Sequence, residues 1–199
     1  NIPIKVAGLN NIKSISAGHM FSLALNNNGE VYSWGICKNG QLGINSFYTF
    51  YPTPQKIKKL ENIKQVSAGH YHALAVDNSG NAWAWGNNNY GQLGDGTTIN
   101  RPEPVKVCDG IYSVCAGLDN SFFDVDNSMG DCYAPILVCG YNSDGQLGIG
   151  HNQPVYSLTE ATTINELGVS GEYFHYTDNM SSNSATLIRS NGVEMAGMN

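Results

Sequence analysis

A repeat of 51 residues is the feature that most constrains the fold of this 199-residue chain. The tetrapeptide Ser-Ala-Gly-His begins at positions 16 and 67, Trp-Gly at 34 and 85, and Gly-Gln-Leu-Gly at 40 and 91. A third copy has Ala-Gly at 116, Cys-Gly at 139 and Gly-Gln-Leu-Gly at 145, and a weaker fourth copy begins near Ser170. A period of this length is typical of stacked repeats, so it limits the possible folds more than any single motif does.

Each unit has the pattern of short strands joined by tight turns. In the second unit, residues 63–68 and 72–77 have strand patterning, and Asn78-Ser79-Gly80 turns the chain into a third strand at 81–85. Proline-rich residues 101–104 predict an outermost strand, because proline tolerates only the edge of a sheet. We therefore predict an all-β fold of four-stranded antiparallel blades. Such a short sheet cannot bury both faces alone, so the copies must stack, and radial stacking gives a β-propeller.

The recurring residues are predicted to be packing residues. Ala-Gly falls where inner strands crowd the propeller axis, and the tryptophans and leucines have the bulk to fill the wedge between blades. The recurrence of histidine at one repeat position favours the same hydrogen-bonded role in the core or inner rim over catalysis. The predicted structural residues are Gly18, His19, Trp34, Gly35, Leu42, Gly69, His70, Trp85, Gly86, Leu93, Gly117, Gly140 and Leu147.

The order Ala-Gly-His, Asn-Gly, then Trp-Gly-x-x-x-x-Gly-Gln-Leu-Gly closely resembles the RCC1 (regulator of chromosome condensation) repeat. The match is specific in the first two units, weaker in the third, where Leu118 and Cys139 replace histidine and tryptophan, and poor in the fourth. Neither the Trp-Asp pair of WD40 repeats nor the Gly-Gly pair of kelch repeats occurs.

The resemblance implies a closed ring of seven blades, of which this chain would hold about four units. We expect one domain over residues 1–199, with units at about 1–51, 52–102, 103–154 and 155–199, the last truncated. We expect the rest of a longer protein to complete the ring, or else a second copy of the chain.

The composition limits the possible partners and the compartment. Ten basic against 16 acidic residues give a net charge of −6, which argues against nucleic-acid binding by this segment. No run approaches the roughly 20 apolar residues of a membrane span. The five cysteines are odd in number and lack Cys-x-x-Cys spacing, which favours reduced thiols and an intracellular location, cytoplasmic or nuclear.

The motifs predict neither a cofactor nor catalysis. His70 and His72 could offer two zinc ligands from one strand, but a third ligand with matching spacing is missing. A segment from Asp124 imitates the start of a calcium loop, but Met129 and Pro135 stand where that loop needs glycine and glutamate. Phosphate-binding loops and nucleophile elbows do not occur. We therefore expect no cofactor, no metal site and no enzyme active site.

Two insertions predict where a partner binds. From Gly117 to Cys139 there are 22 residues, against 16 from Gly69 to Trp85, and about ten extra residues lie near 176–184. Extra residues must project from the stacked core, and loops on a rigid scaffold often carry binding sites, although such insertions are also tolerated without a role. The candidate partner-binding residues are Met129, Asp131, Tyr133, Tyr176 and Asp178.

Two functions fit this pattern. The first is a protein-interaction platform, whose partner is another protein. The second is implied by the resemblance alone: guanine-nucleotide exchange on a Ran-like small GTPase, with the insertion near residues 127–135 as the projecting β-wedge. On that second hypothesis, Asp131→Ala slows nucleotide release.

Overall fold

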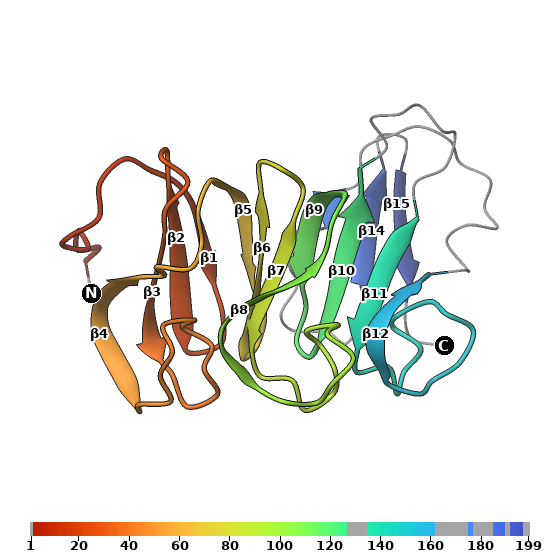
Figure 1. Ribbon diagram of the computed structural model, residues 1–199. Coiled ribbons are helices and arrows are strands. Elements are labelled where there is room, and N and C mark those ends of the chain that lie inside the picture. Colours follow the sequence, from red (N-terminus) through yellow and green to blue (C-terminus); the bar gives the residue numbers. More distant parts are fainter. Residues whose placement is uncertain (1, 127–134, 162–174, 177–184, 190–191, 197–199) are drawn as a thin grey trace.

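The chain forms an array of β-sheets, one after another along the sequence (Figure 1). The computed structural model describes residues 2–126, 135–161, 175–176, 185–189 and 192–196. Within these residues three sheets have four antiparallel strands each and a fourth sheet has three, always in sequence order. The prediction of an all-β fold built from four-stranded antiparallel blades is confirmed. The described residues include no helix that is long and apolar enough to cross a membrane.

The strands of each blade follow the same order from the inner to the outer edge. The first blade contains β1 (Ile12–Ala17), β2 (Phe21–Asn26), β3 (Val31–Ile36) and β4 (Phe50–Lys56). The second contains β5 (Ile63–Ala68), β6 (His72–Asp77), β7 (Ala82–Gly86) and β8 (Arg101–Cys108). The third contains β9 (Ile111–Ala116), β10 (Asn120–Val125), β11 (Ile136–Gly140) and β12 (Val155–Glu160). The smaller sheet contains β13 (His175–Tyr176), β14 (Ala185–Arg189) and β15 (Gly192–Ala196).

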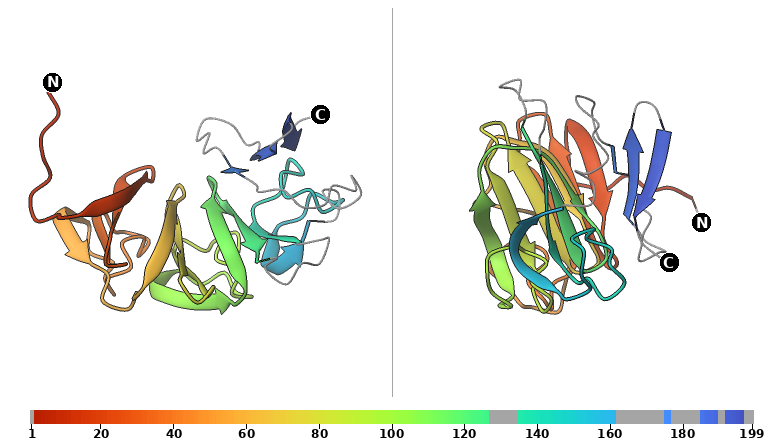
Figure 2. Two further views of the ribbon diagram at one scale, coloured as in Figure 1. Left: turned by 90° about the horizontal axis from the view of Figure 1, so that it is seen from above. Right: turned by 90° about the vertical axis from the view of Figure 1, so that its right-hand side faces the viewer.

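Seen from above, the blades follow one another around an arc (Figure 2). The inner strands β1, β5 and β9 are neighbours, while β4, β8 and β12 lie on the outer side. The outer strand β4 runs across position 52, where the second repeat unit was predicted to begin, so most of it belongs in sequence to the following unit. The unit boundaries themselves stay predictions.

The inner strands approach one another so closely that only glycine fits at one position. A Cβ atom on Gly18 would lie 2.7 Å from the carbonyl oxygen of Gly69, and one on Gly69 would lie 2.5 Å from that of Gly117. Ala68 N donates to Ser16 Oγ at 3.0 Å, and Ala116 N donates to Ser67 Oγ at 2.9 Å. The repeated Ser-Ala-Gly therefore joins each blade to the next at the inner edge.

Large side chains fill the wedge between the first two blades. Trp85 and Leu42 are fully buried in one cluster with Leu23, Ile63 and other apolar residues of both blades. Trp85 Nε1 donates to the Gln41 carbonyl at 3.0 Å, so the indole also satisfies a buried main-chain oxygen of the preceding blade.

The third blade solves the same packing problem with different residues. Cys139 of β11 is equivalent in position to Trp85 of β7. Each pairs with the second residue of the preceding strand of its blade, Ser121 in β10 and Ala73 in β6. The Gln92 carbonyl, equivalent to that of Gln41, accepts from Ser121 Oγ at 2.6 Å and from Cys139 Sγ at 3.4 Å. Phe123 is fully buried in this cluster and supplies the bulk that Cys139 lacks. Leu93 and Leu147 are buried like Leu42.

Leu42→Ala tests the wedge. It should lower the free energy of unfolding by about 2–5 kcal/mol, because it leaves a cavity between two blades. Urea unfolding followed by circular dichroism measures the change. The control is Ile15→Ala, at a side chain that is 77% exposed on the first blade, where we expect a change within about 0.5 kcal/mol. Equal effects of the two substitutions would contradict the assigned packing.

Candidate partner-binding surface

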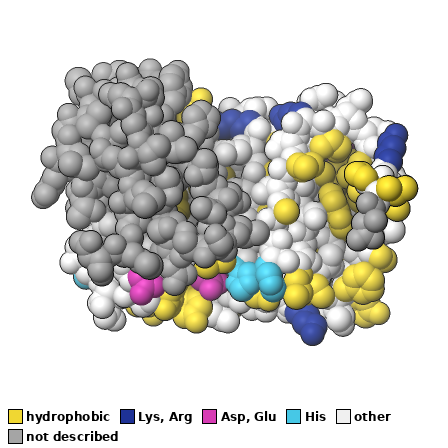
Figure 3. Space-filling model, turned by 180° about the vertical axis from the view of Figure 1, so that it is seen from behind, with side chains coloured by type: hydrophobic (Ala, Val, Ile, Leu, Met, Phe, Trp, Pro, Cys, Tyr) yellow, Lys and Arg dark blue, Asp and Glu magenta, His cyan; other side chains and the backbone are white. Residues whose placement is uncertain are grey.

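Three tight turns at the same position in successive blades bring polar and aromatic side chains to one face of the array. His19 and Met20 lie between β1 and β2, His70 and Tyr71 between β5 and β6, and Leu118 and Asp119 between β9 and β10. Tyr141, in the loop that follows β11, donates its main-chain N–H to the Asp119 carbonyl, and its ring centroid lies 5.0 Å from that of Tyr90 in the loop that follows β7. We call these eight residues the inner loop surface. Figure 3 shows histidine side chains beside acidic ones along the lower edge of the molecule.

The backbone of this surface is the same in each blade. The carbonyl groups of Met20, Tyr71 and Asp119 each accept a hydrogen bond of 2.8 Å from the start of the long loop in their own blade. Across the turn, Gly18 N donates to the Phe21 carbonyl, and the other two blades repeat this bond at 2.9 Å. The side chains therefore differ from blade to blade on a framework that does not.

Histidine and tyrosine side chains pack together at the boundary of the first two blades. His19 Nδ1 and the Tyr71 hydroxyl form a hydrogen bond of 3.0 Å. The ring centroids of His19 and His70 are 4.4 Å apart, and those of His70 and Tyr71 are 4.1 Å apart. His19 is exposed and the other two are half-buried. These side chains form a preorganised and partly exposed aromatic group.

The next boundary carries a carboxyl group instead. Gln92 Nε2 donates to Asp119 Oδ1 and to Asn87 Oδ1, both at 3.1 Å. Burial raises the pKa of Asp119 and lowers the pKa of His70, while the interaction between the two opposes both shifts. Burial thus disfavours the charged form of each group.

The same glutamine position has no such acceptor at the first boundary. Gln41 is fully buried, and among the described residues its Nε2 atom has no hydrogen-bond partner. Tyr71 stands where the next blade has Asp119, and Ile36 stands where it has Asn87. Two substitutions within the repeat have therefore removed both acceptors.

Beneath the surface, His72 belongs to the core. Its Nε2 atom lies 2.9 Å from Ser121 Oγ, which itself donates to the Gln92 carbonyl, so His72 Nε2 donates to the serine. Burial lowers the pKa of His72 to about 3, so the ring is neutral at physiological pH. His70 lies instead on the inner loop surface, so the two histidines do not form a common metal site. Within the described ranges, no group of three or more His, Cys, Asp and Glu residues is placed to hold a metal ion.

The structure leaves the partner-binding residues predicted from the sequence as predictions. Met129, Asp131, Tyr133 and Asp178 lie outside the described residues. Tyr176 ends β13, where it pairs with Leu187 of β14. Sequence reasoning missed Tyr71 and Asp119. A signal was available, since these positions differ in all three units and lie two residues after the repeated Ala-Gly.

Comparison with known proteins establishes the family. Two family models of the regulator of chromosome condensation (RCC1) repeat match the chain, one at residues 28–76 and 79–123 and the other at 12–41 and 63–92. Together they cover more than half of its length. The chain belongs to the RCC1 repeat family. The resemblance predicted from the Ala-Gly-His and Gly-Gln-Leu-Gly motifs is thereby confirmed.

Curated relatives are much longer than this RCC1 array. Over 151 residues the chain is 40% identical to the Probable E3 ubiquitin-protein ligase HERC6 of Homo sapiens, which covers 72% of this chain and 14% of HERC6. Over 108 residues it is 41% identical to the ultraviolet-B receptor UVR8 of Arabidopsis thaliana, which covers 53% of this chain and 24% of UVR8. The chain thus spans no more than about a quarter of these relatives.

Solved structures share the fold at low sequence identity. Human WBSCR16 superposes with a TM-score of 0.79 at 22% identity, over 98% of this chain and half of that protein. Prp20p from Saccharomyces cerevisiae superposes with a TM-score of 0.68 at 21% identity, over 77% of this chain and 39% of Prp20p.

His72→Phe tests the buried histidine through pH. Because the folded-state pKa of about 3 lies below the ordinary value of 6.5, the unfolded chain binds a proton first as the pH falls. The stability contributed by neutral His72 is therefore present above about pH 6.5 and lost progressively towards pH 3. Phenylalanine, which the first blade has at this position as Phe21, should remove that acid-dependent loss.

Urea unfolding at several pH values between 7 and 4 measures this dependence. The unmodified chain is the reference, and His72→Phe should show a flatter dependence over this range. If the slope survives in His72→Phe, buried His72 is not its source.

Proposed function

We propose that this RCC1 array is a protein-interaction platform and that the inner loop surface is its docking face. The observation that carries the proposal is the combination of a repeated, hydrogen-bonded backbone with side chains that differ between blades. Tyrosine, methionine and histidine occur there side by side, and aromatic residues and methionine are enriched at protein interfaces. A rigid framework also lowers the entropic cost of binding.

We propose that the segment recognises a partner and carries out no catalysis itself. HERC6 and HERC5 are named as protein ligases, but they align with this chain over only 14% and 10% of their lengths. On this proposal, any such activity of a longer protein lies outside the aligned repeats. The net charge of −6 supports a protein partner over a nucleic acid.

We place this function inside the cell, in the cytoplasm or nucleus. Among the described residues Cys37, Cys108 and Cys139 are free thiols. Burial raises the pKa of the Cys108 thiol to about 11, so it is protonated and unreactive at physiological pH. Free thiols support a reducing compartment.

Affinity capture with surface variants tests the platform. The immobilised chain is compared with a double variant, His19→Ala with Tyr71→Ala, using quantitative mass spectrometry of retained proteins. Hot-spot residues cost about 2 kcal/mol or more on truncation, so we expect at least about a tenfold loss of the specific partners.

The matched control changes the same residue types elsewhere. His151→Ala with Tyr156→Ala removes two exposed side chains, one just before β12 and one in it, and should retain the partners. Equal retention by both double variants would remove the inner loop surface as the docking face.

Nucleotide exchange on a Ran-like small GTPase is the second candidate function. It draws support from Prp20p, whose structure is described together with its binding to Gsp1p and histones. The insertion near residues 127–135, predicted as a β-wedge, lies outside the described residues.

Release of a fluorescent nucleotide from a Ran-like GTPase separates the two functions. The platform proposal predicts a release rate unchanged by saturating amounts of the chain. A rate increase that the His19→Ala and Tyr71→Ala double variant abolishes would establish the exchange function instead.

A further inference from the structure

The buried amide group of Gln41 has the same orientation as its equivalent in the second blade. Gln41 Oε1 accepts a hydrogen bond of 2.9 Å from Asn39 N, and Gln92 Oε1 accepts one of 2.9 Å from Tyr90 N. Because the oxygen is fixed in the same way, each Nε2 atom is directed at the inner turn of the following blade. In the second blade this is where Gln92 meets Asp119.

The second boundary shows which chemical group fits beside this amide. There a carboxylate oxygen of Asp119 accepts from Gln92 Nε2 at 3.1 Å. The first boundary has Tyr71 at this position, and its hydroxyl bonds to His19 instead. Among the described residues Gln41 Nε2 has no acceptor, and a buried donor without one is costly. A carboxylate from outside the chain would satisfy a donor that the chain leaves unpaired.

The other side chains of the first boundary can accommodate a negative charge. Tyr71 has a hydroxyl group, and the exposed His19 has a second ring nitrogen besides the one that bonds to Tyr71. Asp119 interacts electrostatically with His70, but its carboxyl group is bound by Gln92 at the second boundary. The first boundary therefore offers an amide, a phenol and imidazole groups, and a tyrosine stands where the second boundary has its carboxyl group.

Access to the Gln41 amide requires the rotation of one side chain. Gln41 is 0% exposed, so the half-buried phenol of Tyr71 turns aside before an external group reaches Nε2. The turn itself keeps its place, because the Tyr71 carbonyl accepts from Asn87 N at 2.8 Å. Rotamer changes of this kind are common at interfaces whose backbone moves little. The rotation also frees the Tyr71 hydroxyl from His19 Nδ1.

We propose that the first blade boundary is a carboxylate-binding subsite, in which an Asp or Glu side chain of the protein partner binds Gln41 as Asp119 binds Gln92. One carboxylate oxygen accepts from Gln41 Nε2, and the other accepts from the rotated Tyr71 hydroxyl. A carboxylate has about four acceptor sites, so it satisfies both donors at once. This subsite rests on the proposed function, because it needs the inner loop surface to be the docking face.

Selection from a library of random peptides, displayed between two constant segments, tests the subsite. The chain should enrich peptides that share one Asp or Glu position. A selected peptide is then made with an amidated C-terminus, which excludes binding through a terminal carboxylate. Replacing its shared acidic residue by Asn or Gln should weaken binding about tenfold or more in fluorescence anisotropy, because Gln41 loses a charged acceptor.

Two variants of the chain remove the subsite in different ways. Gln41→Glu keeps the oxygen that accepts from Asn39 N and replaces the donor by a second carboxylate oxygen. Tyr71→Asp fills the subsite from within, as Asp119 does at the next boundary. Each should weaken peptide binding about tenfold or more. Gln153→Glu is the matched control, because it adds the same charge at an exposed residue before β12 and should leave binding unchanged.

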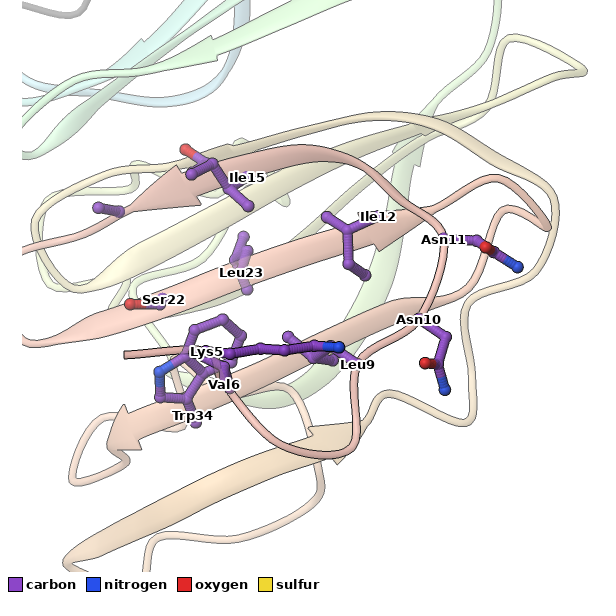
Figure 4. A pocket seen from close by; sticks show the side chains of 12 residues that line it. Lys5, Val6, Leu9, Asn10, Asn11, Ile12, Ile15, Ser22, Leu23 and Trp34 are labelled. Atoms are coloured by element: carbon purple, nitrogen blue, oxygen red, sulfur yellow. The ribbon is translucent and has the colours of Figure 1, made fainter. Parts of the chain in front are cut away.

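A second control concerns the groove of about 680 Å³ beside β1. Figure 4 shows Lys5 there with Val6, Leu9 and Trp34, so the groove offers a cation to an acidic peptide. Lys5→Ala removes this charge and should leave binding of the selected peptide unchanged. Loss of binding in Lys5→Ala, with binding retained in Gln41→Glu, would assign the acidic residue to the groove instead.

Thermal unfolding of each variant checks that it is folded. The subsite is overturned if the selection yields no shared acidic position, or if Gln41→Glu and Tyr71→Asp bind the peptide as tightly as the unmodified chain. Failure of the proposed function has a different result, because selected peptides would then bind equally well to the double variant His19→Ala with Tyr71→Ala. If the double variant loses the peptide and Gln41→Glu keeps it, the docking face stands and only the carboxylate subsite fails.

Discussion

The indole of Trp85 packs against Leu42 of the preceding blade and donates its N–H to the Gln41 carbonyl, and the rest of the array depends on this kind of contact. A four-stranded sheet has two apolar faces and cannot shield both from water alone. Each blade is stable because its neighbours cover it. At the inner edge Gly18 lies close to Gly69, and Gly69 to Gly117. This close approach brings the blades near enough for the large side chains to fill the space between them.

Because the contacts between blades provide the stability, the side chains in the turns of the inner loop surface are free to vary. Their backbone bonds recur in each blade, whereas the side chains change from Met20 to Tyr71 to Asp119. These sequence differences also affect a buried group. Gln41 Nε2 lacks the hydrogen-bond acceptors that Asp119 and Asn87 give to Gln92. The side chains of this surface thus differ on a constant backbone, with one unsatisfied amide group at the first boundary as the consequence.

The sequence predicted the blades well because their packing residues recur at fixed spacing. Trp85, Leu42 and Gly69 occupy buried or crowded positions of the kind that spacing and size indicate. The packing of the third blade was harder to predict from the sequence. The loss of tryptophan at Cys139 is compensated by Phe123 from another strand, and a repeat alignment does not show such exchanges of volume. The inner loop surface was missed because a difference between repeats at a single position has no evident function in the sequence. Its significance is clear only when the structure brings the side chains together.

Every blade has two unlike faces. One offers a loop carbonyl and a leucine, and the other offers an indole or its substitute, as the pair of Gln41 and Trp85 shows. Contacts of this kind are heterologous: the surface used on one side is never the surface used on the other. A two-fold symmetric dimer therefore cannot satisfy these faces by pairing like with like. Association through them runs in one direction only, and the rotation between successive blades decides whether the series closes on itself or continues as a helix.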